Sequence, residues 1–459
     1  MPFDPTLATI RFGMGLSPDI ALPQSVDDML ARLSGPDEIA ARIPISLYYD
    51  AYPSPSDFRD ATIALNQARG TDGEAAAAEI QAGLREDARN AVANVMKAEF
   101  ARATHTTDGF RERLTRFWAD HFTVRPTVGT TRHLVSSHVE QFIRPHVAGT
   151  FADMLSAAVQ SPMMVLYLDQ QRSMGPNSQS ARNNDRGLNE NLARELLELH
   201  TLGVTGTYTQ TDVRELAKLL TGVTANAQRG GYFRPQQAEP GPETVLGVTY
   251  GGNEESIDNV IAALRDIAVH PDTAQHLARK LAVHFIAPDP DSALVDTMAQ
   301  AYLGSGGQLI AMYDVMLASD LAWDSQLQKV KQPFDFVASS MRALAAPLDV
   351  IQNATLQEVR RLIQRPLSVM GQVWQNPVGP DGWPEDEESW ITPQGMAGRI
   401  TWAMEVPRAL VFDLPDPRDF VYHALGPTPP EPVLFAANAA ETIQDGIGIV
   451  LASAAFQRR

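Results

Sequence analysis

Apolar residues recur at helical spacing along almost the whole chain, and this periodicity limits the fold more than any other feature. Residues 73–104 repeat Ile80, Leu84 and Ala88 on one side of an alanine-rich stretch of strong helix formers. Similar stripes cover residues 109–122, 131–148 and 150–168 and return in quick succession from residue 255 to 346. We therefore predict a mainly α protein, a compact multi-helical body that forms a single domain over residues 1–459.

Three segments depart from the helical pattern. Residues 223–253 hold glycine-bounded runs of β-branched and aromatic residues, which predicts a small β-ribbon or flap near residues 225–252. Residues 169–187 are predicted to form a polar loop, and residues 413–433 a proline-rich strap. Strand should therefore stay below roughly a tenth of the residues, against a norm of about 20–25%.

The helix predicted over residues 187–203 carries an unusual polar face. At about 100° per residue, Glu190, Asn191, Arg194, Glu195 and Glu198 fall on one arc that contains no lysine. One interpretation is an exposed face of ion pairs between residues four apart. The other is a buried polar site, in which Asn191, Arg194, Glu195 and Glu198 form one hydrogen-bonded network beside the main pocket.

Three residues outside this helix are candidate partners of that site. His121 lies beside the apolar face of the helix at 109–122, so we expect it to be buried and hydrogen-bonded to a polar residue of another helix. It is either a core residue or a functional group that faces the central helix. Asp169 begins the polar loop. Trp383 belongs to the Trp- and Pro-rich segment 365–393, which either lines a pocket mouth or seals the core.

Several sequence stretches resemble one protein family. They include Asn-Glu-Asn-x-Ala-Arg-Glu-Leu-x-Glu-Leu-His-Thr-Leu-Gly-Val at 189–204, Phe117-Trp118-x-Asp120-His121-Phe122, Lys280-Leu281 and Gly382-Trp383-Pro384. Together they are similar to the signature of the bacterial family catalogued as domain of unknown function 1800. The likeness covers nearly the whole chain and implies no particular reaction. Where the family commonly has a histidine this chain has Ala238, so any role of that histidine would be missing.

Charge and composition exclude several classes of function. The formal net charge of −18 argues against binding to nucleic acid or to an anionic membrane surface. The absence of cysteine excludes disulfides, thiolate catalysis and cysteine-ligated metals. No apolar run approaches the ~20 residues of a membrane span. The N-terminus lacks the regions of a signal peptide, which predicts a cytoplasmic protein or a sequence that begins after a removed leader, since many relatives look exported.

Two hypotheses about function remain open. The first is an enzyme of hydrolytic type, because carboxylates clustered in a cleft perform acid–base chemistry. Its predicted catalytic residues are Glu195, Glu198 and His121, and its predicted substrate-binding residues are Asn191, Arg194, Asp169 and Trp383. Motifs for nucleotide binding, a serine nucleophile or zinc are absent, no metal ligand set is recognised, and the cofactor is unknown.

The second hypothesis is a non-catalytic binding or assembly factor. Genes of the resembled family often lie beside those of domain of unknown function 1501, which implies a protein partner from that second family. A polar pocket with perturbed carboxylates would favour the enzyme, and a wide exposed apolar patch would favour the assembly factor.

Overall fold

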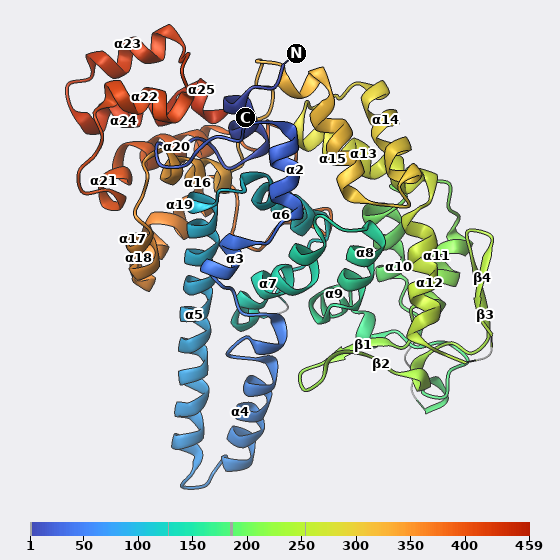
Figure 1. Cartoon of the computed structure of the whole chain (residues 1–459). Coiled ribbons are helices and arrows are strands. Elements are labelled where there is room, and N and C mark those ends of the chain that lie inside the picture. The colour runs from blue at the N-terminus through green and yellow to red at the C-terminus, as the bar shows by residue number, and fades with distance from the viewer. Residues whose placement is uncertain (1, 127, 184–186, 253) are drawn as a thin grey trace.

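Helices make up most of the structure (Figure 1). The computed structural model of the chain describes residues 2–126, 128–183, 187–252 and 254–459. The predicted mainly α class is confirmed. The helices are α1 (Pro5–Leu7), α2 (Val26–Ser34), α3 (Glu38–Arg42), α4 (Pro55–Ala68), α5 (Glu74–His105), α6 (Gly109–His121), α7 (His133–His138), α8 (Phe151–Gln160), α9 (Pro162–Tyr167), α10 (Asn191–Glu195), α11 (Gln210–Leu219), α12 (Ile257–Ala268), α13 (Pro271–Phe285), α14 (Ser292–Gly304), α15 (Leu309–Ala318), α16 (Pro333–Ala343), α17 (Leu348–Asn353), α18 (Leu356–Val359), α19 (Arg365–Val369), α20 (Pro393–Glu405), α21 (Pro407–Leu410), α22 (Pro417–Leu425), α23 (Glu431–Ala439), α24 (Ile443–Ala452) and α25 (Ala454–Gln457).

The β structure consists of two separate antiparallel hairpins rather than one ribbon. Strand β1 (Val223–Asn226) pairs with β2 (Gly230–Phe233), and β3 (Pro242–Val245) pairs with β4 (Val248–Gly251). Four strands of four residues keep the described strand content below a tenth, as predicted. Buried Gln237 and Ala238 lie between the hairpins and separate them.

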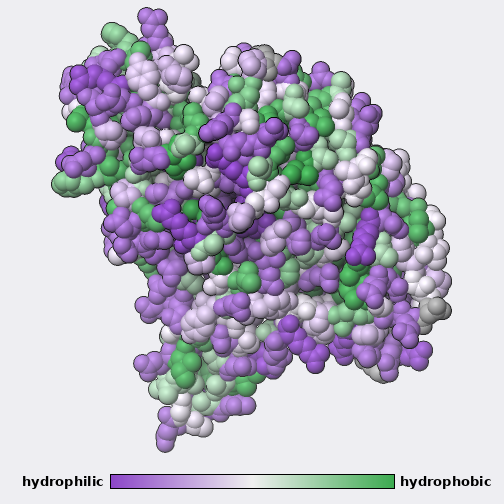
Figure 2. All heavy atoms as spheres, in the orientation of Figure 1, coloured by the Kyte–Doolittle hydropathy of each residue, from purple (hydrophilic) through white to green (hydrophobic). Residues whose placement is uncertain are grey.

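Two apolar clusters form the core. The larger one gathers α6, α8 and α11 to α15, with Trp118 at its centre, where the indole N–H donates to the Tyr313 hydroxyl over 2.6 Å. The smaller one gathers the C-terminal half of α5, α16 and α20 to α24. The α4–α5 hairpin projects from this body (Figure 1), and its tip carries both hydrophobic and hydrophilic side chains (Figure 2). Helix α5 therefore has one end in the core and the other in solvent.

Arg342 of α16 ties three distant segments together. Its side chain is buried and donates to the carbonyl oxygens of Gly15 over 2.7 Å, Thr104 over 2.9 Å and Thr106 over 2.9 Å. Among the described residues no carboxylate forms an ion pair with it, and burial lowers the pKa of its guanidinium to about 10, although Glu112 acts to raise it. Backbone carbonyls thus replace an ion pair as the partners of this buried charge.

Parts of the segment 413–433, for which a strap was predicted, are helical. Helix α22 begins at Pro417, and Asp416 caps it by accepting from the Arg418 N–H. Helix α23 begins at Glu431. Proline is well tolerated in the first turn of a helix because no N–H is needed there. In this segment prolines therefore lie in the first turns of α22 and α23, and not in an extended chain.

The polar loop at 169–187 is anchored to the segment after β2. The Gly175 N–H donates to the Gln237 carbonyl over 2.9 Å, and the Asn177 N–H donates to the Glu239 carboxylate over 2.8 Å. Short helical turns cover Gln170–Arg172 and Ala181–Asn183. Residues 184–186 of this predicted loop lie outside the described residues.

Replacing Arg342 by methionine tests the role of its carbonyl contacts. Arg342→Met keeps an apolar stem but leaves the buried carbonyls without their donor, so we expect a loss of about 3 kcal/mol or more in the free energy of unfolding. Urea denaturation measures this, with exposed Arg408→Met as the matched control. Equal unfolding midpoints for the two variants would contradict the assigned role.

Candidate active site

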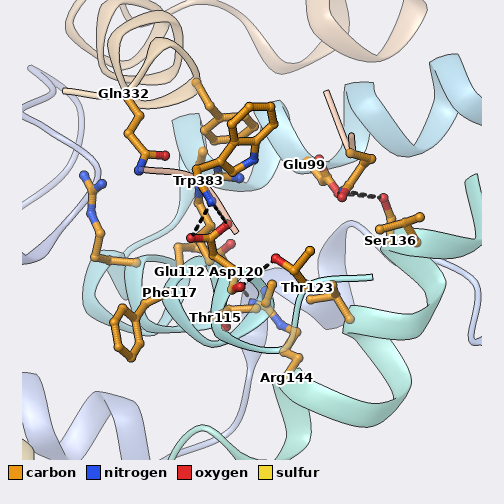
Figure 3. A pocket seen from close by; sticks show the side chains of 18 of the residues that line it. Glu99, Glu112, Thr115, Phe117, Asp120, Thr123, Ser136, Arg144, Gln332 and Trp383 are labelled. Atoms are coloured by element: carbon orange, nitrogen blue, oxygen red, sulfur yellow. Dashed lines mark hydrogen bonds and ion pairs between the residues drawn. The ribbon is translucent and has the colours of Figure 1, made fainter. Parts of the chain in front are cut away.

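Helix α6 presents a charged edge to the interior of the protein. Its sequence places Phe110, Leu114 and Trp118 on an apolar face, and these three side chains are buried in the larger core. Arg113, Arg116 and Asp120 follow one another at spacings of three and four residues, so they share an adjacent face. Arg116 and Asp120 together with Thr115 and Phe117 line a cavity of about 120 Å³ (Figure 3).

Segments far apart in sequence form the walls of this α6 cavity. Helix α5 contributes Glu99 and Arg102, and the helical segment 133–143 contributes Ser136 and Glu140. The start of α16 and the loop before α20 close it. Their contributions are Gln332, Phe334, Asp335, Gln375, Pro377 and Trp383.

The carboxylate of Asp120 is held by the Trp383 backbone. The Trp383 N–H donates to both oxygens, over 2.9 Å to Oδ1 and 3.2 Å to Oδ2 (Figure 3). The preceding Gly382 has φ of +85°, and a Cβ on it would lie 2.7 Å from the carboxylate oxygens. Only glycine allows the loop to approach this closely. The Gly382-Trp383-Pro384 stretch therefore packs its backbone directly against the Asp120 carboxylate.

Asp120 differs from an ordinary carboxyl in its proton affinity. Burial raises its pKa to about 7, although the Trp383 N–H and Lys280 act to lower it. Burial in turn lowers the pKa of Lys280 on α13, against the opposing effect of Asp120, Glu385 and Asp381. Asp120 thus changes its protonation state near neutral pH.

Most arginines that line the cavity have carboxylate partners. Arg102 makes a bidentate pair with Glu140 at 2.7 and 3.0 Å. Arg144 pairs with Glu112, and Arg113 pairs with Asp335. These pairs neutralise one another and leave little charge for a ligand.

Arg116 is the most weakly paired of these arginines. Its guanidinium stacks 3.3 Å from the centroid of the Phe334 ring, and its Nε forms a long ion pair with Asp335 Oδ1 at 3.7 Å. Within the described ranges of the chain its N–H groups have no hydrogen-bonded partner. Burial lowers its pKa, but the guanidinium stays charged. Arg116 is therefore the residue best able to bind an anion in the cavity.

Glu99 lies on the wall that faces α7. Its carboxylate accepts from the Ser136 hydroxyl over 2.7 Å, the Trp374 indole N–H over 2.8 Å and the Gln375 amide over 3.0 Å. Burial raises its pKa even so. A protonated Glu99 can donate to a ligand, whereas the ionised form only accepts.

The polar face of the central helix forms only part of the expected network. Arg194 contacts Glu198 at 3.1 Å and Glu190 at 3.4 Å and donates to Gln210 at 3.0 Å. Asn191 is exposed, and its amide instead donates to the Leu168 carbonyl at 3.4 Å. The predicted network is partly shielded, but the contacts join Arg194 to Glu190, Glu198 and Gln210 of α11 rather than uniting Asn191, Arg194, Glu195 and Glu198. The Arg194 side chain is 38% exposed, so its pairs are worth about 0–1 kcal/mol.

Glu195 and Asp169 lie outside the α6 cavity. Glu195 is half-buried, and burial together with Glu198 and Asp381 raises its pKa. Its electrostatic interaction with Asp381 indicates that it lies near the loop that carries Trp383. Asp169 has a left-handed backbone with φ of +56° and contacts Arg172 at 3.4 Å. Among the predicted site residues, Trp383 lines the cavity.

His121 is buried as predicted. One ring nitrogen, Nε2, is 3.0 Å from the backbone carbonyl of His200, the last residue of the π-helical turn η8 (Leu196–His200) that continues α10. Burial holds the pKa of His121 well below its usual value, so the ring is neutral. Its ring packs against Trp118 and Phe122. These contacts are those of a core histidine.

Sequence reasoning missed Asp120, Lys280, Glu99 and Arg116 as site residues. Asp120 and Lys280 stood inside stretches that carry the family resemblance, and Gly382 and Trp383 stood in a third. The family resemblance therefore pointed to these three stretches, but helix periodicity alone could not show that they meet in the folded protein. Glu99 and Arg116 had no such signal.

The chain belongs to a protein family, which the comparison with family models establishes. The model described as "Protein of unknown function (DUF1800)" matches residues 8–458, nearly the full length. No curated protein and no solved structure matches the chain. The resemblance inferred from the sequence is confirmed.

No three histidine, aspartate or glutamate side chains within the described ranges converge as metal ligands. In the same ranges, no helix has the length and apolar character needed to traverse a bilayer.

Asp120 should make the stability of the protein depend on pH. The folded carboxyl is protonated below pH 7, whereas the unfolded one is protonated only below about 4. The folded state therefore binds more protons between these values, and stability contributed by this group is lost as pH rises through 7. We expect the free energy of unfolding of Asp120→Asn, taken relative to the parent, to be about 1–3 kcal/mol higher at pH 8 than at pH 5.

Urea denaturation at the two pH values measures this difference. Asp289→Asn is the control, because that side chain is 97% exposed and should show no such change. A parent and an Asp120→Asn variant with parallel pH dependence would contradict the raised pKa.

Proposed function

We propose that the chain is a hydrolytic enzyme whose active site is the α6 cavity. The observation that carries the proposal is the Asp120 carboxylate, which has a pKa near 7 and lies in a polar cavity, fixed by the Trp383 N–H. Such a group both takes and gives a proton at neutral pH, as general acid–base catalysis requires. Perturbed carboxyls in a cavity are typical of active sites.

In this mechanism Asp120 acts first as a base. The ionised carboxylate takes a proton from a water molecule while the water oxygen bonds to the electrophilic centre of the substrate. The bond to the leaving group then breaks, and the protonated Asp120 returns the proton to it. The Trp383 N–H keeps the carboxylate oriented through both steps.

Arg116 selects an anionic substrate in this proposal. Its guanidinium has only a long ion pair with Asp335, and its N–H groups suit a phosphate or carboxylate, which guanidinium binds in bidentate fashion. The cavity of about 120 Å³ is smaller than a typical drug-sized pocket. It therefore takes the reacting group of a substrate whose remainder extends outside.

The residues of the central helix have no part in these proton transfers. Glu195 and Asp381, which precedes the Gly382–Trp383 turn, are like charges that repel each other, so Glu195 is assigned no proton transfer and no positioning role. The ion-paired Glu198 and the neutral, buried His121 are assigned no proton transfer. Trp383 keeps the binding role that the sequence suggested.

A non-catalytic binding or assembly role is the second candidate. Phe412 and Phe435 near the C-terminal helices are 94% and 73% exposed, which favours contact with a protein partner. A member of the family catalogued as domain of unknown function 1501 would be such a partner. This role predicts that Asp120→Asn binds the partner as the parent does.

The hydrolytic proposal is tested with chromogenic substrates that differ in charge. We expect hydrolysis of at least one of p-nitrophenyl phosphate, p-nitrophenyl glucuronide and p-nitrophenyl acetate. The rate should rise with pH, with an apparent pKa of about 7. Asp120→Asn should lower kcat by about 10²-fold or more. Arg116→Gln should raise KM for the anionic substrates and leave that of the acetate ester nearly unchanged.

Asp289→Asn serves as the control variant, and thermal melts establish that each variant is folded. Undiminished activity of Asp120→Asn would disprove the assigned base. Failure of the parent protein to cleave any of the three esters or glycosides would count against hydrolysis and favour the binding role.

A further inference from the structure

A second cavity, of about 370 Å³, lies on the other part of α5, away from the α6 cavity. Its walls come from residues 85–96 of α5, from residues 128–132, and from α18 with the following π-helical turn η11 (Arg360–Gln364). Helices α5 and α18 lie side by side in the fold (Figure 1). We call this cavity the α5–α18 groove. It shares no lining residue with the α6 cavity.

The floor of the α5–α18 groove is apolar. Ala88, Val92 and Met96 recur every four residues along one face of α5. Val359 of α18 faces the same space and is 2% exposed. Val128 at the rim remains 55% exposed, although burial of a valine would be favourable. Val92 and Leu356 also line the groove and are half-buried, so these two residues and Val128 offer apolar surface that the protein itself does not fully cover.

Among the residues that the structure describes, four arginines and no carboxylate line this apolar floor. They are Arg85, Arg89, Arg132 and Arg360. Across the described residues none of the four forms an ion pair, and Arg85 donates to the Gln81 amide over 3.0 Å. The Arg132 Nε is buried without a hydrogen-bond partner.

This arrangement is unusual for a chain with a net charge of −18. Arg85 and Arg89 are four residues apart on one helix, where like charges repel. Carboxylates are plentiful in the sequence, yet none lies in the groove to offset these charges. A bound anion would supply the missing negative charge and a partner for the Arg132 Nε.

We propose that the α5–α18 groove binds a small amphipathic anion, with a carboxylate or phosphate head on the arginines and an apolar body along the floor. The volume falls within the range of about 300–1,000 Å³ that is typical of small-molecule pockets. Three separate segments wall the groove, and its apolar lining runs from the half-buried Val92 and Leu356 down to the buried Met96 and Val359. That depth suits a chain-like ligand better than the broad side of a protein partner.

Calorimetric titration of the full chain at low salt tests this proposal. The probes are decanoate and decyl phosphate below their micelle concentrations, so that the two head groups are compared directly. Decyltrimethylammonium has the same chain with the opposite charge, and acetate has the head without the chain. We expect at least one of the two long-chain anions to bind at least tenfold more tightly than either control.

Two kinds of variant locate the binding. The double substitution Arg89→Gln with Arg360→Gln should lower the affinity for the long-chain anion at least tenfold. Arg408→Gln, on exposed surface elsewhere, should leave that affinity unchanged. Val128→Asp adds a negative charge at the exposed rim and should also weaken binding at least tenfold. Thermal melts confirm that each variant is folded.

Several results would overturn the proposal. These are the absence of binding by both decanoate and decyl phosphate, equal binding of the anionic and cationic chains, and parent-like affinity in the double arginine variant and in Val128→Asp. Binding of a glutamate-rich amphipathic peptide in place of either anion would assign the groove to a protein partner. The outcome is independent of the α6 cavity, because the two sites share no residue.

Discussion

The buried ion pair between Arg113 of α6 and Asp335 of α16 joins the two apolar cores of the protein. Arg113 also donates to the Gly13 carbonyl over 2.7 Å, so the N-terminal segment is tied to the same point. A charge removed from water must find partners of its own, which fixes the relative positions of these segments. The α6 cavity is bounded by this ion pair and lies along the charged edge of the helix, where apolar side chains do not fill the space.

Asp335 and Asp120 both line the α6 cavity, but their surroundings give their carboxyl groups very different pKa values. Burial would raise the pKa of Asp335, but Arg113, Arg459 and Arg116 hold it at about 2. Asp120 is shielded as well, but the Trp383 N–H, Lys280 and Arg116 only partly offset the effect of burial, and its pKa is about 7. One carboxyl is therefore structural, and the other is able to exchange protons at neutral pH.

Helix α5 links the two cavities. Near its C-terminal end Glu99 and Arg102 line the α6 cavity, where most charges are paired. Residues 85–96 line the α5–α18 groove, where the arginines are unpaired and the floor is apolar. The same helix thus serves a polar site of small volume and an apolar site of larger volume, and nothing in its alanine-rich sequence distinguishes the two halves.

The sequence determined the local elements and the family. The helix expected over residues 73–104 is α5 at Glu74–His105, and that over 109–122 is α6 at Gly109–His121, because 3.6-residue periodicity is a property of neighbouring residues. The burial of His121 followed from the same periodicity. The mainly α class and the membership in the family were likewise available from the chain alone.

Only the tertiary structure decided where charges meet. Asp120, Lys280 and Trp383 are separated by more than a hundred residues, and periodicity places each on a face without saying which faces pack together. The polar face of the central helix looked like a site because its residues are close in sequence, but its neighbours are α11 and solvent. Helix formation depends on local spacing, whereas burial and compensation of charge depend on partners that folding brings from elsewhere.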